Sequence, residues 1–141
     1  RLVTGLFVTR LATTDDLRFV AASWFLSFWK GTMQRAGAAY EQYRPAQDAL
    51  INTLLQRSRV VVVAAESVPD EIVGYAVLEK HYAHYVYVKS AYRRMGVAKG
   101  LLRSGTTRYT HSTRAGNRVA RALGITFDPY QLLGPTSPER T

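Results

Sequence analysis

The segment from 88 to 102, VKSAYRRMGVAKGLL, constrains the fold more than any other part of this chain. An apolar aromatic run from His84 to Val88 precedes it, and a helical pattern follows its central loop. The loop combines small residues with cationic ones: Gly96 and Ala98 with Arg93, Arg94 and Lys99. The order strand, loop and helix predicts an anion site, because backbone N–H groups at a helix start converge on a negative group.

Length and composition indicate an ordinary globular protein. The 141 residues suggest one domain, which we expect at 1–133, with 134–141 as a disordered tail. Hydrophobic residues make up 47% of the chain and charged residues 21%, and no apolar run is long enough for a transmembrane helix. Because the chain has no cysteine, it cannot use a thiol nucleophile or a disulfide, and we expect a cytoplasmic protein without membrane association.

The net charge of +9 is placed unevenly along the chain. Up to Val88, nine Lys and Arg residues face eight Asp and Glu residues. From Lys89 onward, ten basic residues face two acidic ones, so the basic excess begins where the loop begins. Such a surface attracts a phosphorylated ligand, an acidic acceptor or nucleic acid.

Hydrophobic periodicity predicts alternating strands and helices. Thr13 or Thr14 is the expected cap of the first helix, Pro45 is expected at the first position of the second, and Gly74 indicates a bulge or a close backbone contact. A turn is expected at 68–70. We expect strands at 5–12, 58–66, 71–79, 85–88, 106–113 and 125–133, and helices at about 15–29, 46–56, 96–103 and 115–123.

The loop resembles the acyl-CoA pyrophosphate loop of the GNAT superfamily of N-acyltransferases. That family's pattern is Gln or Arg, two residues, Gly, one residue, then Gly or Ala, and Arg93, Gly96 and Ala98 match it. Val88 and Tyr92 also fit, and the element order is the family's from about residue 8 to 133. The resemblance implies an α+β fold, an α/β sandwich in which helices flank both faces of a mixed, mostly antiparallel sheet.

The resemblance also implies a co-substrate and a reaction. Acyl-CoA, with acetyl-CoA as the first expectation, would transfer its acyl group directly to a primary amine. Tyr87 and Val88 would hold the pantetheine arm and the acyl carbonyl through their main chain. The pyrophosphate would be bound by the loop residues Arg93, Arg94, Met95, Gly96, Val97, Ala98 and Lys99.

The residues that transfer protons are less evident. The family commonly uses a Glu or a water relay as base, and a Tyr on the helix after the fifth strand as acid. Here that helix, which contains Asn117, has no Tyr. His titrates near neutrality and is a further candidate base. The candidates are Tyr130 or Tyr109 as acid, and Glu79, His84 or His111 as base.

The sequence also bears on metal binding, alternative functions, the acceptor and the oligomeric state. His81 and His84 lie three residues apart with no carboxylate cluster beside them, so no metal site is predicted. The basic C-terminal part allows a nucleic-acid-associated protein as an alternative function, and the missing Tyr allows a domain that binds acyl-CoA without turnover. The identity of the amine acceptor does not follow from the sequence, and a homodimer, common among similar proteins, is also open.

Overall fold

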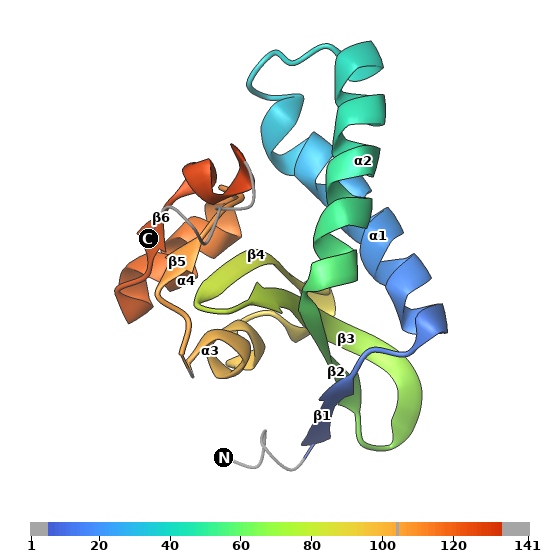
Figure 1. Ribbon diagram of the computed structural model, residues 1–141. Coiled ribbons are helices and arrows are strands. Elements are labelled where there is room, and N and C mark those ends of the chain that lie inside the picture. Colours follow the sequence, from blue (N-terminus) through green and yellow to red (C-terminus); the bar gives the residue numbers. More distant parts are fainter. Residues whose placement is uncertain (1–5, 104, 134–141) are drawn as a thin grey trace.

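The protein contains a six-stranded mixed sheet, in the order β1-β2-β3-β4-β5-β6 (Figure 1). The computed structural model describes residues 6–103 and 105–133, so the tail expected at 134–141 lies outside the described residues. The first four strands pair antiparallel, whereas β4–β5 and β5–β6 are parallel. The strands are β1 (Phe7–Leu11), β2 (Arg59–Ala65), β3 (Val68–Glu79), β4 (Tyr82–Val88), β5 (Arg108–Tyr109) and β6 (Thr126–Phe127).

Helices cover both faces of this sheet, which confirms the predicted α+β fold. Figure 1 shows α1 and α2 side by side, and their aromatic and aliphatic residues form one buried cluster with β2, β3 and β4. Two further clusters lie under α3 and α4 on the opposite face. The helices are α1 (Thr14–Phe28), the π-helical η2 (Trp29–Met33), α2 (Tyr40–Arg57), α3 (Val97–Leu102) and α4 (Arg114–Leu123), with short 3₁₀ turns η3 (Ser90–Tyr92) and η4 (Pro129–Leu133).

The start of α1 follows the expected capping chemistry. The Thr13 side chain accepts a hydrogen bond from the backbone N–H of Asp16, and the Asp16 carboxylate accepts one from the backbone N–H of Thr13. This capping box satisfies two N–H groups that the helix itself leaves unpaired. Arg10 on β1 forms an ion pair with the same carboxylate, which joins the first strand to the first helix.

The start of α2 corrects the prediction made from Pro45. The helix begins at Tyr40, so Pro45 lies inside it rather than at its first position. Tyr43 explains the earlier start: its side chain is buried and packs against Phe25 with ring centroids 4.9 Å apart. The Tyr43 hydroxyl also donates to the Phe25 carbonyl at 2.6 Å, so tertiary contacts with α1 hold the first turn of α2 in place.

Strand bounds differ from the prediction in two regions. The expected turn at 68–70 is part of β3, because the pairing of β2 with β3 shifts register between Ala64 and Ala65. Pro69 lies in that irregular section, where no ladder N–H is required. The strands expected at 106–113 and 125–133 are only two residues long each. Their remaining residues form connections to α4 and the turn η4.

Gly74 fulfils the predicted role of a close backbone contact. A Cβ atom built at Gly74 would lie 2.8 Å from the carbonyl oxygen of Tyr87 and 3.3 Å from a methyl group of Val97. Only glycine therefore allows β3 to approach β4 at this point and α3 to pack over both strands.

We predict that Gly74→Ala destabilises the protein by about 1–3 kcal/mol, because the added methyl group overlaps a backbone oxygen that cannot move alone. Urea denaturation followed by circular dichroism measures the change. Gly100→Ala is the matched control, since a Cβ at Gly100 on α3 meets nothing within 4 Å. The control should be neutral or slightly stabilising. Equal stabilities for the two variants would contradict the prediction.

Candidate active site

Strands β4 and β5 diverge after a short parallel contact. Their pairing is limited to two residues on each strand and ends where the Thr110 N–H donates to the Ala83 carbonyl at 3.1 Å. Beyond this point β4 continues to Val88, paired with β3 on one edge only. The other edge of β4 therefore presents unpaired backbone groups to the space between the two strands.

A β-bulge at His84 marks the place where the strands separate. Val77 of β3 pairs with Tyr85, and Leu78 pairs with Ala83, so His84 is an extra residue on β4. An extra residue bends the bulged strand and increases its twist. The bulge thus directs the second half of β4 away from β5.

The loop between β4 and α3 contains two residues in the left-handed region. Arg94 has φ 70° and Gly96 has φ 81°. In the described part of the chain, none of the backbone N–H groups from 94 to 99 donates to another backbone group. Successive unpaired N–H groups in such a turn form a concave site that favours an anion.

Contacts with the sheet hold this loop in position. The Arg93 Nε donates to the Val88 carbonyl at 3.0 Å. Val97, at the start of α3, is buried in a cluster with Val63 and Val73. The Tyr92 ring contacts the sheet edge through an edge-to-face contact with Phe7, at 5.8 Å between centroids. The loop is therefore fixed before any ligand binds.

A cavity of about 760 Å³ lies along the open edge of β4. This volume is in the range of cavities that bind a cofactor or a small ligand. It extends from the end of α1 to the loop and the first turns of α4. Its lining residues are Ser27, Gly31, Arg35, Tyr85, Val86, Tyr87, Val88, Tyr92, Arg93, Arg94, Gly96, Val97, Ala98, Lys99, Leu102, Thr113, Arg114, Ala115, Gly116, Arg118 and Val119.

One helical face forms the wall opposite the loop. Ser27, Gly31 and Arg35 are spaced four residues apart, so they lie on the same side of α1 and its continuation through η2. The Thr32 hydroxyl donates to the Ser112 carbonyl at 2.9 Å, which ties η2 to the segment that follows β5. This hydrogen bond fixes the wall over the opening between β4 and β5.

The cavity is strongly cationic. Its lining contains six Arg and Lys side chains and no Asp or Glu. Among the described residues, none of these six forms an ion pair, since the ion pairs there involve Arg10, Arg57 and His84. Uncompensated charge of one sign in a hollow concentrates anions there. The cations are Arg35, Arg93, Arg94, Lys99, Arg114 and Arg118.

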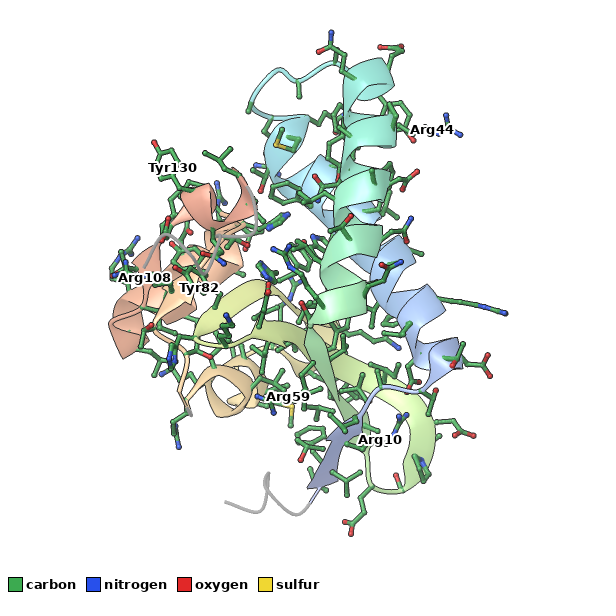
Figure 2. The ribbon with its side chains drawn as sticks, in the orientation of Figure 1. Arg10, Arg44, Arg59, Tyr82, Arg108 and Tyr130 are labelled. Carbon is green, nitrogen blue, oxygen red and sulfur yellow. The ribbon has the colours of Figure 1, made fainter. Side chains whose placement is uncertain are left out.

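The structure brings the predicted loop residues together but separates the candidate acid and bases from them. Of the nine predicted acyl-CoA contacts, only Met95 does not line the cavity. Tyr130 on η4 is 74% exposed and is not a lining residue, and Figure 2 shows it projecting outward. Glu79 does not line this cavity either, whereas His84 lines a separate one of about 20 Å³ between β4 and α4.

Glu79 and His84 belong instead to a buried chain of hydrogen bonds. The His84 Nε2 lies 2.8 Å from Glu79 Oε1, and its Nδ1 lies 2.9 Å from Thr110 Oγ1. The same hydroxyl lies 3.1 Å from His111 Nδ1, and His111 Nε2 lies 3.1 Å from the side-chain nitrogen of Gln47. The chain links α2 to β4 and to the segment after β5.

Burial and charge set the protonation of these groups. Burial lowers the pKa of His84, and its hydrogen bond with Glu79 opposes this only in part. Burial also lowers the pKa of His111 to about 3. For Glu79, burial acts to raise the pKa, but hydrogen bonds from His84 and Arg57 outweigh it and leave the pKa below its ordinary value. Both histidines are therefore neutral at neutral pH.

The cavity also contains a hydroxyl pair that the sequence did not reveal. The Tyr85 and Ser27 hydroxyl oxygens lie 2.6 Å apart, and Ser27 Oγ donates to the Ser23 carbonyl at 2.6 Å. The Tyr85 O–H therefore donates to Ser27. Burial raises the pKa of Tyr85 to about 12, so it remains protonated. Four-residue spacing from Ser27 to Arg35 was the available signal, but it became meaningful only with α1 placed against β4.

In residues 6–103 and 105–133, no helix is long and apolar enough to cross a membrane. Within the same residues, no group of three or more His, Cys, Asp or Glu side chains could hold a metal ion.

Comparison with known proteins gives a family match. The sequence model of the acetyltransferase (GNAT) family matches residues 22–123. The structure is similar to that of YjaB from Escherichia coli, with 19% identity, a TM-score of 0.52 and coverage of 71% of this chain and 64% of YjaB. It is also similar to a GCN5-related N-acetyltransferase from Ralstonia eutropha JMP134, with 17% identity, a TM-score of 0.53 and coverage of 93% and 94%.

These similarities have defined limits. The chain spans less than two thirds of the length of YjaB, at 64%. At identities below 20% the two structures support the fold alone. No curated protein matches this chain.

We predict that folding stability falls as the pH drops below 6.5, the ordinary pKa of histidine, toward the value of about 3 for His111. In this window the unfolded chain binds protons that the buried histidines do not, so stability is complete above it and is lost within it. One histidine contributes a slope of up to about 1.4 kcal/mol per pH unit. Urea denaturation between pH 8 and pH 5 measures this slope.

His111→Gln should reduce the slope, and His81→Gln serves as its control because His81 is exposed. An unchanged slope in His111→Gln would show that burial of this side chain does not govern the pH dependence.

Proposed function

Because the chain belongs to the acetyltransferase (GNAT) family, we propose that it transfers an acyl group, acetyl in the first instance, from acyl-CoA to a primary amine. The family and the fold support acyl transfer from acyl-CoA to an amine. The observation that carries the proposal is the loop from 93 to 99, whose unpaired N–H groups and cationic side chains line the cavity beside the open edge of β4.

Backbone geometry supports an additional strand-like partner on β4. The Lys89 N–H donates to the Val73 carbonyl of β3. The N–H groups of successive residues along a strand point to opposite edges. The N–H of Val88 therefore points away from β3, to the open edge, whereas the carbonyl of Tyr87 faces Gly74 on β3. We assign the main-chain contact with the acyl carbonyl to Val88. The amide groups of the pantetheine arm would pair with the rest of this edge.

Positioning supplies much of the rate enhancement in such a reaction. A thioester and an amine held in a reactive orientation gain several kcal/mol relative to their encounter in water. The attacking amine must be in its free-base form, and its proton leaves to solvent as the new amide forms. The carbonyl oxygen gains negative charge during attack, which an N–H donor stabilises.

The leaving thiolate needs a hydrogen-bond donor. We assign this role to Ser27, because it lines the cavity and its O–H can turn from the Ser23 carbonyl to the sulfur while Tyr85 continues to donate to Ser27 Oγ. Tyr130 is less suited, since its side chain is 74% exposed and outside the lining. Glu79 and His84 engage each other within the core and are more suited to positioning β4 than to contact with substrate.

We predict that Gly96→Asp weakens acetyl-CoA binding at least about tenfold relative to Gly96→Asn, as measured by calorimetric titration. Asp and Asn both tolerate the left-handed conformation that Gly96 adopts, with φ 81°. A Cβ at this position meets nothing within 4 Å. The two variants thus differ mainly in a negative charge placed where the pyrophosphate should bind.

The three possible outcomes separate the candidate functions. Equal affinities of the two variants for acetyl-CoA would show that the pyrophosphate does not bind at this loop. No binding to the unmodified protein would overturn the proposal and favour a nucleic-acid-associated function. Binding without transfer to any amine would favour an acyl-CoA-binding domain without turnover.

We also predict that Ser27→Ala lowers kcat roughly tenfold to hundredfold without changing the acetyl-CoA dissociation constant. Ser23→Ala is the matched control: Ser23 lies one turn earlier on α1, bonds the Tyr75 hydroxyl at 2.7 Å and does not line the cavity. Ser27→Ala removes the Ser27 partner of the Tyr85 hydroxyl, whereas in Ser23→Ala the Tyr75 hydroxyl keeps the Val20 carbonyl at 3.1 Å. Stability should therefore fall more in Ser27→Ala, and kcat is compared at a temperature where both variants are folded. Equal kcat values in the two variants would exclude Ser27 as the donor.

A further inference from the structure

The cavity contains more positive charge than the co-substrate requires. The loop contributes Arg93, Arg94 and Lys99 beside the expected pyrophosphate, and α4 contributes Arg114 and Arg118 on the adjoining wall. Contacts between α3 and α4 place these two groups next to each other. Together they provide five cations for the phosphates of CoA, all on the α3 and α4 side of the sheet.

Arg35 comes from the opposite wall. It lies on the cavity in line with Ser27 and Gly31, beyond η2, on the side of the sheet covered by α1 and α2. Its side chain is exposed and forms no ion pair within the described residues. Arg35 shares this wall with Ser27, the residue assigned to the leaving sulfur, so it would face an amine that enters from this side of β4.

The cavity lining offers no carboxylate for a cationic acceptor. An amine acceptor approaches mostly as an ammonium ion, and a polyamine or a basic peptide would be repelled by Arg35, which the phosphates of bound CoA leave uncompensated. An acceptor that also carries an anionic group would be attracted instead. The planar guanidinium group of arginine binds a carboxylate or a phosphate through two parallel hydrogen bonds.

We infer that the acceptor is a small amine that carries an anionic group, a carboxylate or a phosphate, and that Arg35 binds this group. The inference rests on the proposed function, since it concerns the acceptor of that reaction. The anionic group bound to Arg35 would hold the amine end of the acceptor toward the open edge of β4.

Matched pairs of acceptors test the charge requirement. Acetyl transfer is measured by the release of the CoA thiol from acetyl-CoA. The acceptor pairs are each amino acid with its amide, β-alanine with β-alaninamide, and phosphoethanolamine with ethanolamine. Values of kcat/KM are compared per free-base amine, because the members of a pair differ in their amine pKa. We expect the anionic member to exceed its neutral partner by at least about tenfold in the preferred pair. The carboxylate and phosphate arms identify which anion is used.

Two arginine variants test the assignment of the residue. Arg35→Gln should reduce the preference for the anionic acceptor about tenfold or more, chiefly through KM, and should leave acetyl-CoA affinity unchanged. Arg44→Gln is the control, because Arg44 projects from α2 into solvent (Figure 2) and does not line the cavity. This control should retain the preference in full.

The remaining outcomes overturn the inference in distinguishable ways. Loss of acetyl-CoA binding in the unmodified protein would overturn the proposed function itself. Two results would overturn the inference alone, with acetyl-CoA still bound. One is acetyl transfer to neutral amines or to spermidine that equals or exceeds transfer to the anionic acceptors. The other is the absence of transfer to any anionic acceptor. If Arg35→Gln weakens the binding of acetyl-CoA but not of 3′-dephospho-acetyl-CoA, then Arg35 contacts the 3′-phosphate of the co-substrate rather than the acceptor. Competition between acetyl-CoA and a DNA duplex would assign the cations to nucleic acid.

Discussion

The hydrogen bond between His84 and Thr110 lies at the point on which the rest of the structure depends. It joins the two residues that directly follow the last β4–β5 pair, Ala83 with Tyr109, at 2.9 Å between Nδ1 and Oγ1, and His84 is itself the extra residue of a bulge. On one side of this point the strands form a ladder, and on the other side they enclose the cavity. The same two residues therefore join the strands and begin their separation.

The buried chain that contains this hydrogen bond specifies geometry more than it adds stability. The Gln47 side-chain nitrogen can only donate, so His111 Nε2 accepts this hydrogen bond. The proton of the neutral His111 ring is then on Nδ1, which donates to the Thr110 hydroxyl. The Thr110 hydroxyl then donates to His84, which donates to Glu79. Each ring nitrogen of His84 and His111 has one partner in this chain, so the chain has one direction and fixes both tautomers. Fully satisfied networks of this kind restrict a core to one arrangement, and removing a member leaves a buried group unpaired.

The sequence predicted what local residues determine. Gly96, Ala98 and the neighbouring cations fix the loop, and Thr13 fixes the start of α1, because each acts within a few residues of itself. Predictions failed where distant contacts decide, as when packing of Tyr43 against α1 extends α2 toward its N-terminus past Pro45. The far wall of the cavity, with Ser27, Gly31 and Arg35, was not predicted either. Its relation to β4 exists only after α1 packs on the sheet.

The cations of the cavity are divided between two walls, one formed by the loop and α4 and the other by α1 and the segment that follows it. A loop that binds phosphates needs its cations near the backbone N–H groups, and these cations are consecutive or nearly so in the sequence. In the proposed reaction an acceptor would reach the same reacting carbon from the other side of β4, so a group that selects it would come from the elements on that side. Arg35, distant in sequence from every other cation of the cavity, is the residue that we propose for this role. Its position two residues after η2, which contains Thr32, would also link acceptor binding to the contact between Thr32 and Ser112. Selection of the acceptor and the opening between β4 and β5 would thus depend on the same part of the chain, from η2 to Arg35.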